Sequence, residues 1–167
     1  QYPFHFWQID HLDFSTLEKG VGESKQVNKG YKYILVVIDI FSKYVYLFPC
    51  KKKAMEDVIS VLQKLFLSGD IPEHIGADRG FGGQNFMKLF NHFGIKLHTS
   101  KPYSPQTQGF AENKVKHVKS LLAQYFVKSE NFSFYHILDQ ISFTINNTKH
   151  SVTKTTPFQL HRGRDIN

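Results

Sequence analysis

The first fifty residues carry the apolar pattern of β-strands. Residues 4–14 alternate loosely, with Phe4, Phe6 and Leu12 on one side and Trp7 and Ile9 on the other. Residues 31–41 are almost continuously apolar, which is typical of a central strand covered on both faces. A short turn and residues 43–48 follow, so the pattern predicts an antiparallel hairpin. Residues 15–30 are rich in Gly, Lys, Glu and Ser and predict a loop.

The apolar period changes after these strands. Apolar residues recur at helical spacing from Met55 to Phe66, and Gly69 and Pro72 end this helix. Beyond it we expect strands at 74–78 and 95–98, helices at 86–94, 110–127 and 134–147, and loops at 80–83 and 99–109. This order predicts one α/β domain over residues 1–167, with a mixed sheet flanked by helices and no internal boundary.

Composition narrows the possible partners. The chain has 21 Lys and Arg against 14 Asp and Glu, a net charge of +7, which favours a polyanion, nucleic acid first. A single Cys excludes an intrachain disulfide and a Cys-based zinc finger. No apolar run approaches the roughly 20 residues of a membrane span, so no membrane partner is expected. The chain starts at Gln1 without a secretion signal, and we expect it to be a fragment of a longer protein.

Three acidic residues stand out by their placement. Asp10 lies inside the first strand, in WQID, where a buried carboxylate is costly without a partner. Asp78 follows a predicted strand and precedes a glycine-rich loop, the usual position of a functional group in an open α/β sheet. Glu112 lies in the first turn of a predicted helix. A turn or cap for each Asp, and a helix-dipole partner for the Glu, remain open alternatives.

Other titratable residues near these positions receive structural interpretations. We expect Asp39 to begin the hairpin turn and to bond the backbone near Ser42. Asp13 is expected on the strand face opposite Asp10, because the two are an odd number of residues apart. His11 is expected to pack within its strand. None of the nine histidines is assigned as a metal ligand.

The helix after Gly109 has two distinct faces. Glu112, Lys116 and Lys119 share one face at i, i+4 and i+7. A second, apolar stripe faces the core and comprises Val115, Val118, Leu122 and Tyr125. The first face is either an ordinary exposed Glu–Lys pair or a metal ligand beside phosphate contacts.

In this order, these motifs resemble the catalytic core of retroviral-type integrases, the DDE strand-transfer family with an RNase H-like fold. The matching segments are WQID at Asp10, DRG at 78–80, YSPQTQGFAENKVKHVK at 103–119 and the closing NNTKHSVTKTTPFQLHRGR. The resemblance covers residues 4–164. It is strongest to integrases of Polinton/Maverick elements and virophages, and next to those of Ty3/gypsy-like retrotransposons.

The resemblance implies an α/β fold with a mixed five-stranded sheet and a divalent-metal-dependent polynucleotidyl transferase. Asp10, Asp78 and Glu112 would hold two Mg²⁺ or Mn²⁺ ions, which suits their hard oxygen ligands. Element DNA would be trimmed at its 3′ end and then joined to target DNA.

The resemblance also implies the partners. Gln108, Lys116 and Lys119 would contact DNA, and the protein would work at least as a dimer, in the host nucleus or in a viral particle or factory. Two rival functions remain open: an RNase H-type nuclease with the same carboxylates, and a domesticated core that has lost catalysis and serves as a DNA-binding or dimerising scaffold.

Overall fold

The computed structural model describes residues 2–13, 30–51, 55–99, 105–128, 134–151 and 153–164. Within these ranges the sheet contains the strands β1 (Phe6–Asp13), β2 (Tyr33–Asp39), β3 (Val45–Cys50), β4 (His74–Gly76) and β5 (Lys96–His98). Their order is β3-β2-β1-β4-β5. The β1–β2 and β2–β3 pairs are antiparallel, and the β1–β4 and β4–β5 pairs are parallel. The expected mixed five-stranded sheet is therefore confirmed.

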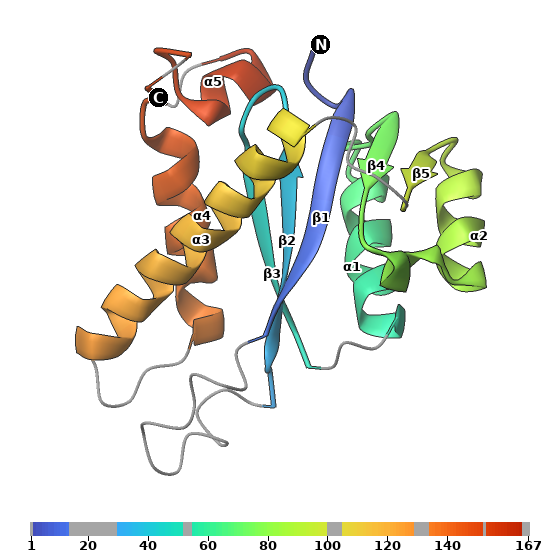
Figure 1. The fold of residues 1–167 in the computed structure, drawn as a ribbon, viewed down its shortest axis with the longest axis horizontal. Coiled ribbons are helices and arrows are strands. Elements are labelled where there is room, and N and C mark those ends of the chain that lie inside the picture. Colours follow the sequence, from blue (N-terminus) through green and yellow to red (C-terminus); the bar gives the residue numbers. More distant parts are fainter. Residues whose placement is uncertain are drawn as a thin grey trace.

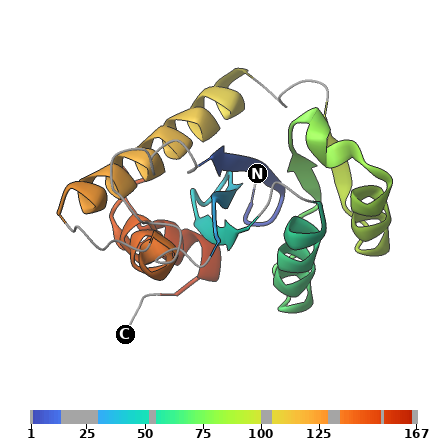
Figure 2. The same cartoon turned by 90° about the horizontal axis from the view of Figure 1, so that it is seen from below.

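Helices cover both faces of this sheet. Along the chain they are α1 (Met55–Leu67), α2 (Gln84–His92), α3 (Pro105–Lys128), α4 (Phe134–Asn147) and α5 (Pro157–Arg162), with a 3₁₀ turn, η2, at Arg79–Gly82. Figures 1 and 2 show α1 and α2 on one side of the sheet and α3 and α4 on the other. None of the described helices is long and apolar enough to span a membrane.

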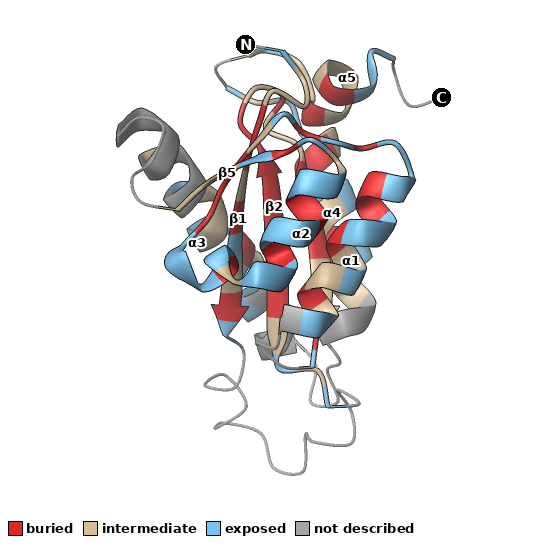
Figure 3. Cartoon of the chain, turned by 90° about the vertical axis from the view of Figure 1, so that its right-hand side faces the viewer, coloured by how far each residue is buried: buried red, intermediate tan, exposed pale blue. Residues whose placement is uncertain are grey.

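The alternation in β1 divides the core into two halves. Trp7 and Ile9 pack with α1 and α2, whereas Phe6 and Leu12 pack with α3 and α4. The central strand β2 contributes to both halves, and Figure 3 shows it almost wholly buried between the helical layers. This confirms the expected faces for the residues of β1 and gives each face a different environment. Phe4 is a correction: it packs with Trp7 instead of Phe6, because it precedes β1 and its positive φ breaks the strand alternation.

The structure corrects two predicted loops. Residues 105–109, expected in a loop, form the first turn of α3. Pro105 occupies the first helical position, where its missing N–H costs no hydrogen bond and its fixed φ already suits a helix. Within the expected loop at 80–83, η2 forms around the buried ring of Phe81. Most of the predicted loop at 15–30 lies outside the described residues.

Helix α5 was not expected. Thr156 caps it by accepting a hydrogen bond from the Gln159 backbone, while the Gln159 side chain accepts from the Thr156 backbone. The helix begins at Pro157 and ends before Gly163, which adopts the left-handed conformation. Both residues are typical of helix ends. These signals are present in the TTPFQLHRG segment of the sequence.

Candidate active site

The parallel pairing of β1 with β4 brings Asp10 and Asp78 to neighbouring positions. Gln8 lies opposite Gly76 in this ladder. Asp10 is two residues after Gln8, and Asp78 is two residues after Gly76. Because side chains alternate along a strand, Asp10 shares the face of Gln8, which is also the face of Phe6 and is covered by α3 and α4. The two carboxylates therefore meet at the carboxyl end of β4.

Gly76 allows this close strand approach. A Cβ atom at position 76 would lie 2.4 Å from Gln8 Oε1 and 2.9 Å from Phe6 Cζ. No real Cβ tolerates such distances, so any larger residue would displace these side chains of β1. The glycine thus leaves room for the Gln8 and Phe6 side chains on the face of β1 that carries Asp10.

The pKa of Asp10 reflects its surroundings. Partial desolvation by the surrounding protein raises this pKa above its usual value, and the charge of Asp78 raises it further. The backbone N–H of His11 and the charges of His11 and Lys119 act in the opposite direction, but the net pKa remains raised. Asp10 therefore interacts electrostatically with both Asp78 and Lys119. The three residues come from three separate parts of the fold.

Backbone donors hold both carboxylates. The His11 N–H donates to Asp10 Oδ1 at 2.7 Å, and the Gly80 N–H donates to Asp78 Oδ1 at 2.8 Å. Both aspartates remain exposed. Among the described residues, no donor takes up the second oxygen of either carboxylate. Each side chain is thus oriented while one oxygen stays available for a ligand.

His11 packs beside this site, as expected. Its ring stacks on Phe81 with the centroids 4.9 Å apart and the planes inclined by 17°. Phe81 is buried in the middle of η2, the turn that Asp78 caps. The stacked pair therefore connects the loop of Asp78 to the strand of Asp10.

Helix α3 contributes the basic side of the site. Lys116 and Lys119 are exposed, Val118 is fully buried and Val115 packs on the same core, as the helical pattern predicted. The backbones of Gln108 and Glu112 belong to α3, but their side chains lie outside the described part of the chain, as do those of Leu122 and Tyr125. The roles of Gln108 and Glu112 therefore stay predictions.

A second basic group was missed by the sequence analysis. The pKa values of Lys43 and Lys114 are both lowered, first by burial, and Lys43 further lowers that of Lys114. Burial and the charge of Lys114 also lower the pKa values of His117 and His150. These residues come from the β2–β3 turn, α3 and the segment after α4. Only the folded chain could bring them together.

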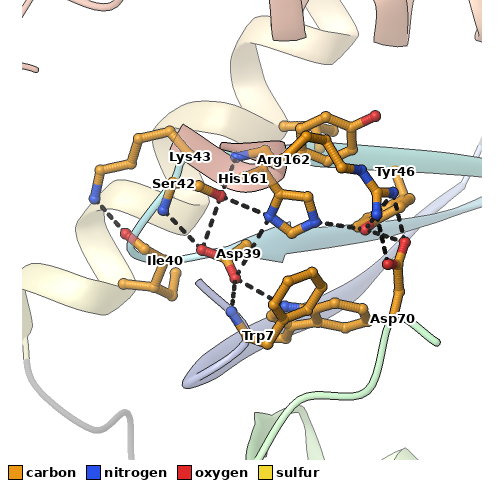
Figure 4. Close-up of polar contacts among 12 residues, drawn as sticks. Trp7, Asp39, Ile40, Ser42, Lys43, Tyr46, Asp70, His161 and Arg162 are labelled. Atoms are coloured by element: carbon orange, nitrogen blue, oxygen red, sulfur yellow. Dashed lines mark hydrogen bonds and ion pairs between the residues drawn. The ribbon is translucent and has the colours of Figure 1, made fainter. Parts of the chain in front are cut away.

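Asp39 belongs to a buried network instead of the carboxylate site (Figure 4). Its Oδ1 accepts from the Ser42 backbone at 2.7 Å, as expected for the turn, and its Oδ2 accepts from Trp7 Nε1 at 3.0 Å and from the Phe4 backbone at 2.7 Å. His161 Nδ1 lies 3.0 Å from Ser42 Oγ. Ser, His and Asp are thus neighbours, which resembles a hydrolase triad.

This grouping is structural. Ser42 and Asp39 are fully buried, and Ser42 Oγ bonds directly to the Asp39 carboxylate at 2.9 Å, leaving no reactive hydroxyl for a substrate. His161 Nε2 instead lies 2.7 Å from the Tyr46 hydroxyl. The network fixes α5 against the β2–β3 hairpin.

An ion pair extends this network. Tyr46 donates to Asp70 Oδ2 at 2.7 Å, and Arg162 binds both oxygens of Asp70 at 2.6 Å (Figure 4). Burial alone would raise the pKa of Asp70, but the hydrogen bonds from Arg162 and Tyr46 lower it below its usual value. The segment after α4 is therefore tied to the sheet by charge as well as by packing.

The donor set of Asp10 and Asp78 fits a hard divalent cation. Carboxylate oxygens are the preferred ligands of Mg²⁺ and Mn²⁺. Burial is the main cause that raises the pKa of Asp10, and the charge of Asp78 raises it further; a cation between the two carboxylates would relieve the repulsion between them.

Comparisons with known proteins show the family to which the chain belongs. The integrase core domain model matches residues 1–105. The Pro-Pol polyprotein of feline foamy virus is 32% identical over 142 residues, covering 84% of this chain and 12% of that polyprotein. The chain thus spans about an eighth of the length of the curated relatives it matches first.

Solved structures extend the likeness to the whole fold. The simian T-cell lymphotropic virus intasome, in complex with PP2A regulatory subunit B56 gamma, aligns with a TM-score of 0.78 at 25% identity, covering 99% of this chain and 57% of that one. The HTLV-2 integrase catalytic core in complex with magnesium, in its dimeric form, aligns with a TM-score of 0.70 at 26% identity, covering 98% of both chains. The special similarity to Polinton integrases stays a prediction. The chain belongs to the integrase core domain family, and its sheet and helices form the RNase H-like fold of integrase catalytic cores.

Proposed function

We propose that this domain is the catalytic core of a DNA strand transferase, which processes the 3′ ends of element DNA and joins them to target DNA. The observation that carries the proposal is that Asp10 of β1 interacts electrostatically with Asp78, which caps η2 directly after β4, and with Lys119 of α3. Family membership supports the same reaction class.

Three carboxylates would form the metal site. Asp10 and Asp78, joined by Glu112 of α3, would hold two Mg²⁺ or Mn²⁺ ions. When bound, such ions neutralise charge on the reacting phosphate and make a water or 3′ hydroxyl nucleophilic. The His11 and Gly80 backbones keep the two carboxylates oriented before a metal arrives. This preorganisation limits the rearrangement needed on binding.

Basic side chains would supply the DNA contacts. Lys116 and Lys119 are exposed on α3, and Lys119 acts electrostatically on Asp10. Phosphates bound by these two lysines would therefore lie next to the carboxylates. Gln108 would contact the terminal nucleotides. Lys43 and Lys114 offer further positive charge across the β2–β3 turn.

The proposed partners are element DNA, target DNA and at least one further copy of the chain. The dimeric HTLV-2 core and the T-cell lymphotropic virus intasome support this assembly. Action at two DNA ends calls for more than one active site. The proposed location is where element DNA meets host DNA, in the nucleus, or in a viral particle or factory.

A metal-dependent thermal shift tests the proposed site. Mn²⁺ should raise the melting temperature of the wild-type chain by mass action, and Asp78→Asn should abolish that rise while the metal-free variant stays folded. Lys64→Ala is the control. Lys64 is exposed on α1, which covers the other face of the sheet, so this variant should keep the full Mn²⁺-dependent rise in melting temperature. An equal Mn²⁺ shift in wild type and Asp78→Asn would contradict the proposal and favour a catalytically silent scaffold.

A further inference from the structure

A second cluster of ligand-type side chains lies at the other end of the same two strands. His5 directly precedes β1, Glu73 directly precedes β4, and His74 is the first residue of β4. One ligand atom from each of the three lies within 4.8 Å of the other two. Asp10 and Asp78 are farther along both strands, so this cluster is separate from the carboxylate site.

The backbone positions these three residues. The Glu73 N–H donates to the Phe4 carbonyl at 2.8 Å, and the His74 N–H donates to the His5 carbonyl at 3.1 Å. On the other side, the Lys96 N–H donates to the Glu73 carbonyl at 2.9 Å. The cluster is therefore built on two neighbouring strand starts, those of β1 and β4, and is flanked by the start of β5. Rigid elements hold binding groups more precisely than loops do.

The side chains are already converging. His5 Nδ1 lies 3.1 Å from Glu73 Oε2, and the Tyr2 hydroxyl donates to the other oxygen of the same carboxylate. His74 Nδ1 lies 3.0 Å from His98 Nε2. His5 and His74 also meet edge to face, with ring centroids 5.3 Å apart. Two imidazoles and one carboxylate thus gather within 4.8 Å of one another, and a third imidazole, that of His98, contacts His74.

We propose that His5, Glu73 and His74 form a binding site for a divalent transition metal, with Zn²⁺ as the preferred ion. Zn²⁺ takes imidazole nitrogens and carboxylate oxygens at about 2.0–2.2 Å, and two histidines with one glutamate are an established ligand set that leaves a fourth position for water. The three ligand atoms lie within 4.8 Å of one another, so rotation of the side chains would bring them around an ion. His98 is a positioning residue: its Nε2 contacts Nδ1 of His74 and so orients the His74 ring.

Such an ion would clamp the segment before β1 to the start of β4. This is the strand pair that, farther along, carries Asp10 and Asp78. The site differs in chemistry from the carboxylate site, because Mg²⁺ prefers oxygen ligands and keeps its waters. Zn²⁺ binding and Mg²⁺ binding can therefore be measured separately on one molecule.

The experiment is a calorimetric titration of the full chain with Zn²⁺ in the presence of excess Mg²⁺, paired with thermal unfolding. We expect one saturable site per chain and a Zn²⁺-dependent rise in melting temperature. His5→Ala and Glu73→Gln should each weaken binding by about tenfold or more. Glu73 is exposed, so its neutral variant should fold normally. The control His92→Ala changes an exposed histidine on α2 and should bind like wild type.

A further variant separates the two sites. Asp78→Asn should leave the affinity for Zn²⁺ unchanged, and Co²⁺ in place of Zn²⁺ should give a visible absorption band that Glu73→Gln removes. The proposal is overturned if Zn²⁺ shows no saturable binding. It is equally overturned if His5→Ala and His92→Ala lose affinity alike, or if Asp78→Asn alone removes the site.

Discussion

Asp10 and Asp78 are 68 positions apart in the chain, yet the charge of Asp78 raises the pKa of Asp10. The parallel β1–β4 ladder produces this relationship by placing Gln8 opposite Gly76. Two like charges held together in a metal-free protein repel each other, and a cation bound between them would relieve this repulsion. The pair is therefore the physical basis of the proposed metal site.

The coupling can be measured directly. Asp78→Asn should lower the pKa of Asp10, because it removes a neighbouring negative charge while keeping the side-chain size. The measurement is an NMR titration of the Asp10 carboxyl carbon in the metal-free protein. Asp13→Asn, an exposed change elsewhere on β1, is the matched control and should shift the titration less. An unchanged Asp10 pKa in Asp78→Asn would show that the carboxylates do not interact.

Lys119 should connect DNA binding to this site. Lys119→Ala should weaken DNA binding at low salt and reduce the slope of log affinity against log salt by about one unit, since one phosphate contact is lost. The same variant should raise the pKa of Asp10, which Lys119 now lowers. Lys116→Ala should change the salt slope similarly.

Fold stability should change little in both lysine variants, because both side chains are exposed opposite the buried Val118. Fluorescence anisotropy at several salt concentrations gives the slope, and Lys64→Ala on α1 is the control. Unfolding of Lys119→Ala with an unaltered slope would assign that lysine a structural role.

Gly76 should be sensitive to the smallest enlargement. Gly76→Ala places a methyl group in contact with the buried ring of Phe6, and we expect it to lower the free energy of unfolding by about 1–3 kcal/mol. The displacement of β1 against β4 should also weaken Mn²⁺ binding. Gly82→Ala, whose new Cβ would meet no atom closer than 3.8 Å, is the control. Denaturant unfolding measures both, and equal stability of the two variants would contradict the tight strand approach.

The buried network predicts an acid-sensitive fold. Burial lowers the pKa of His161 to about 4, against 6.5 for an ordinary histidine. The unfolded chain therefore binds more protons than the folded chain between these values, so stability falls as pH falls from about 6.5 to 4. The loss can reach about 3 kcal/mol. Denaturant unfolding at a series of pH values measures it.

His161→Phe supplies the test of that assignment. The variant cannot titrate, so the pH dependence between 6.5 and 4 should flatten. At neutral pH it should be less stable by about 1–3 kcal/mol, because the Ser42 and Tyr46 hydroxyls lose their shared partner. An unchanged pH profile would assign the acid sensitivity to other groups, and His92→Ala should keep the wild-type profile.

The sequence predicted those features that depend on local pattern. The alternation of apolar residues predicted which side chains of β1 lie on each face of the sheet. The helical spacing in α3 predicted that Val118 is buried and that Lys116 and Lys119 are exposed. Asp39 was predicted at its turn because Asp bonds backbone N–H groups a few residues ahead. Such preferences act over a few residues and survive in the folded chain.

Features that depend on strand register could not be predicted. The gathering of His5, Glu73 and His74 requires the β1–β4 pairing, and the contact of His161 with Ser42 joins residues 119 positions apart. The early start of α3 was missed because Gly109 was taken as the end of a loop, whereas a helix tolerates an isolated glycine at a cost of about 1 kcal/mol.

The most direct test of the proposed function is DNA strand joining with and without the Asp78 carboxylate. The protein that contains this core is mixed with element-end DNA, target DNA and Mn²⁺ or Mg²⁺, and joined products are separated by size. The account predicts metal-dependent joined products for wild type and Lys64→Ala, and none for Asp78→Asn. Joined products from Asp78→Asn at the wild-type level would contradict it, as would hydrolysis without any joining by the wild type.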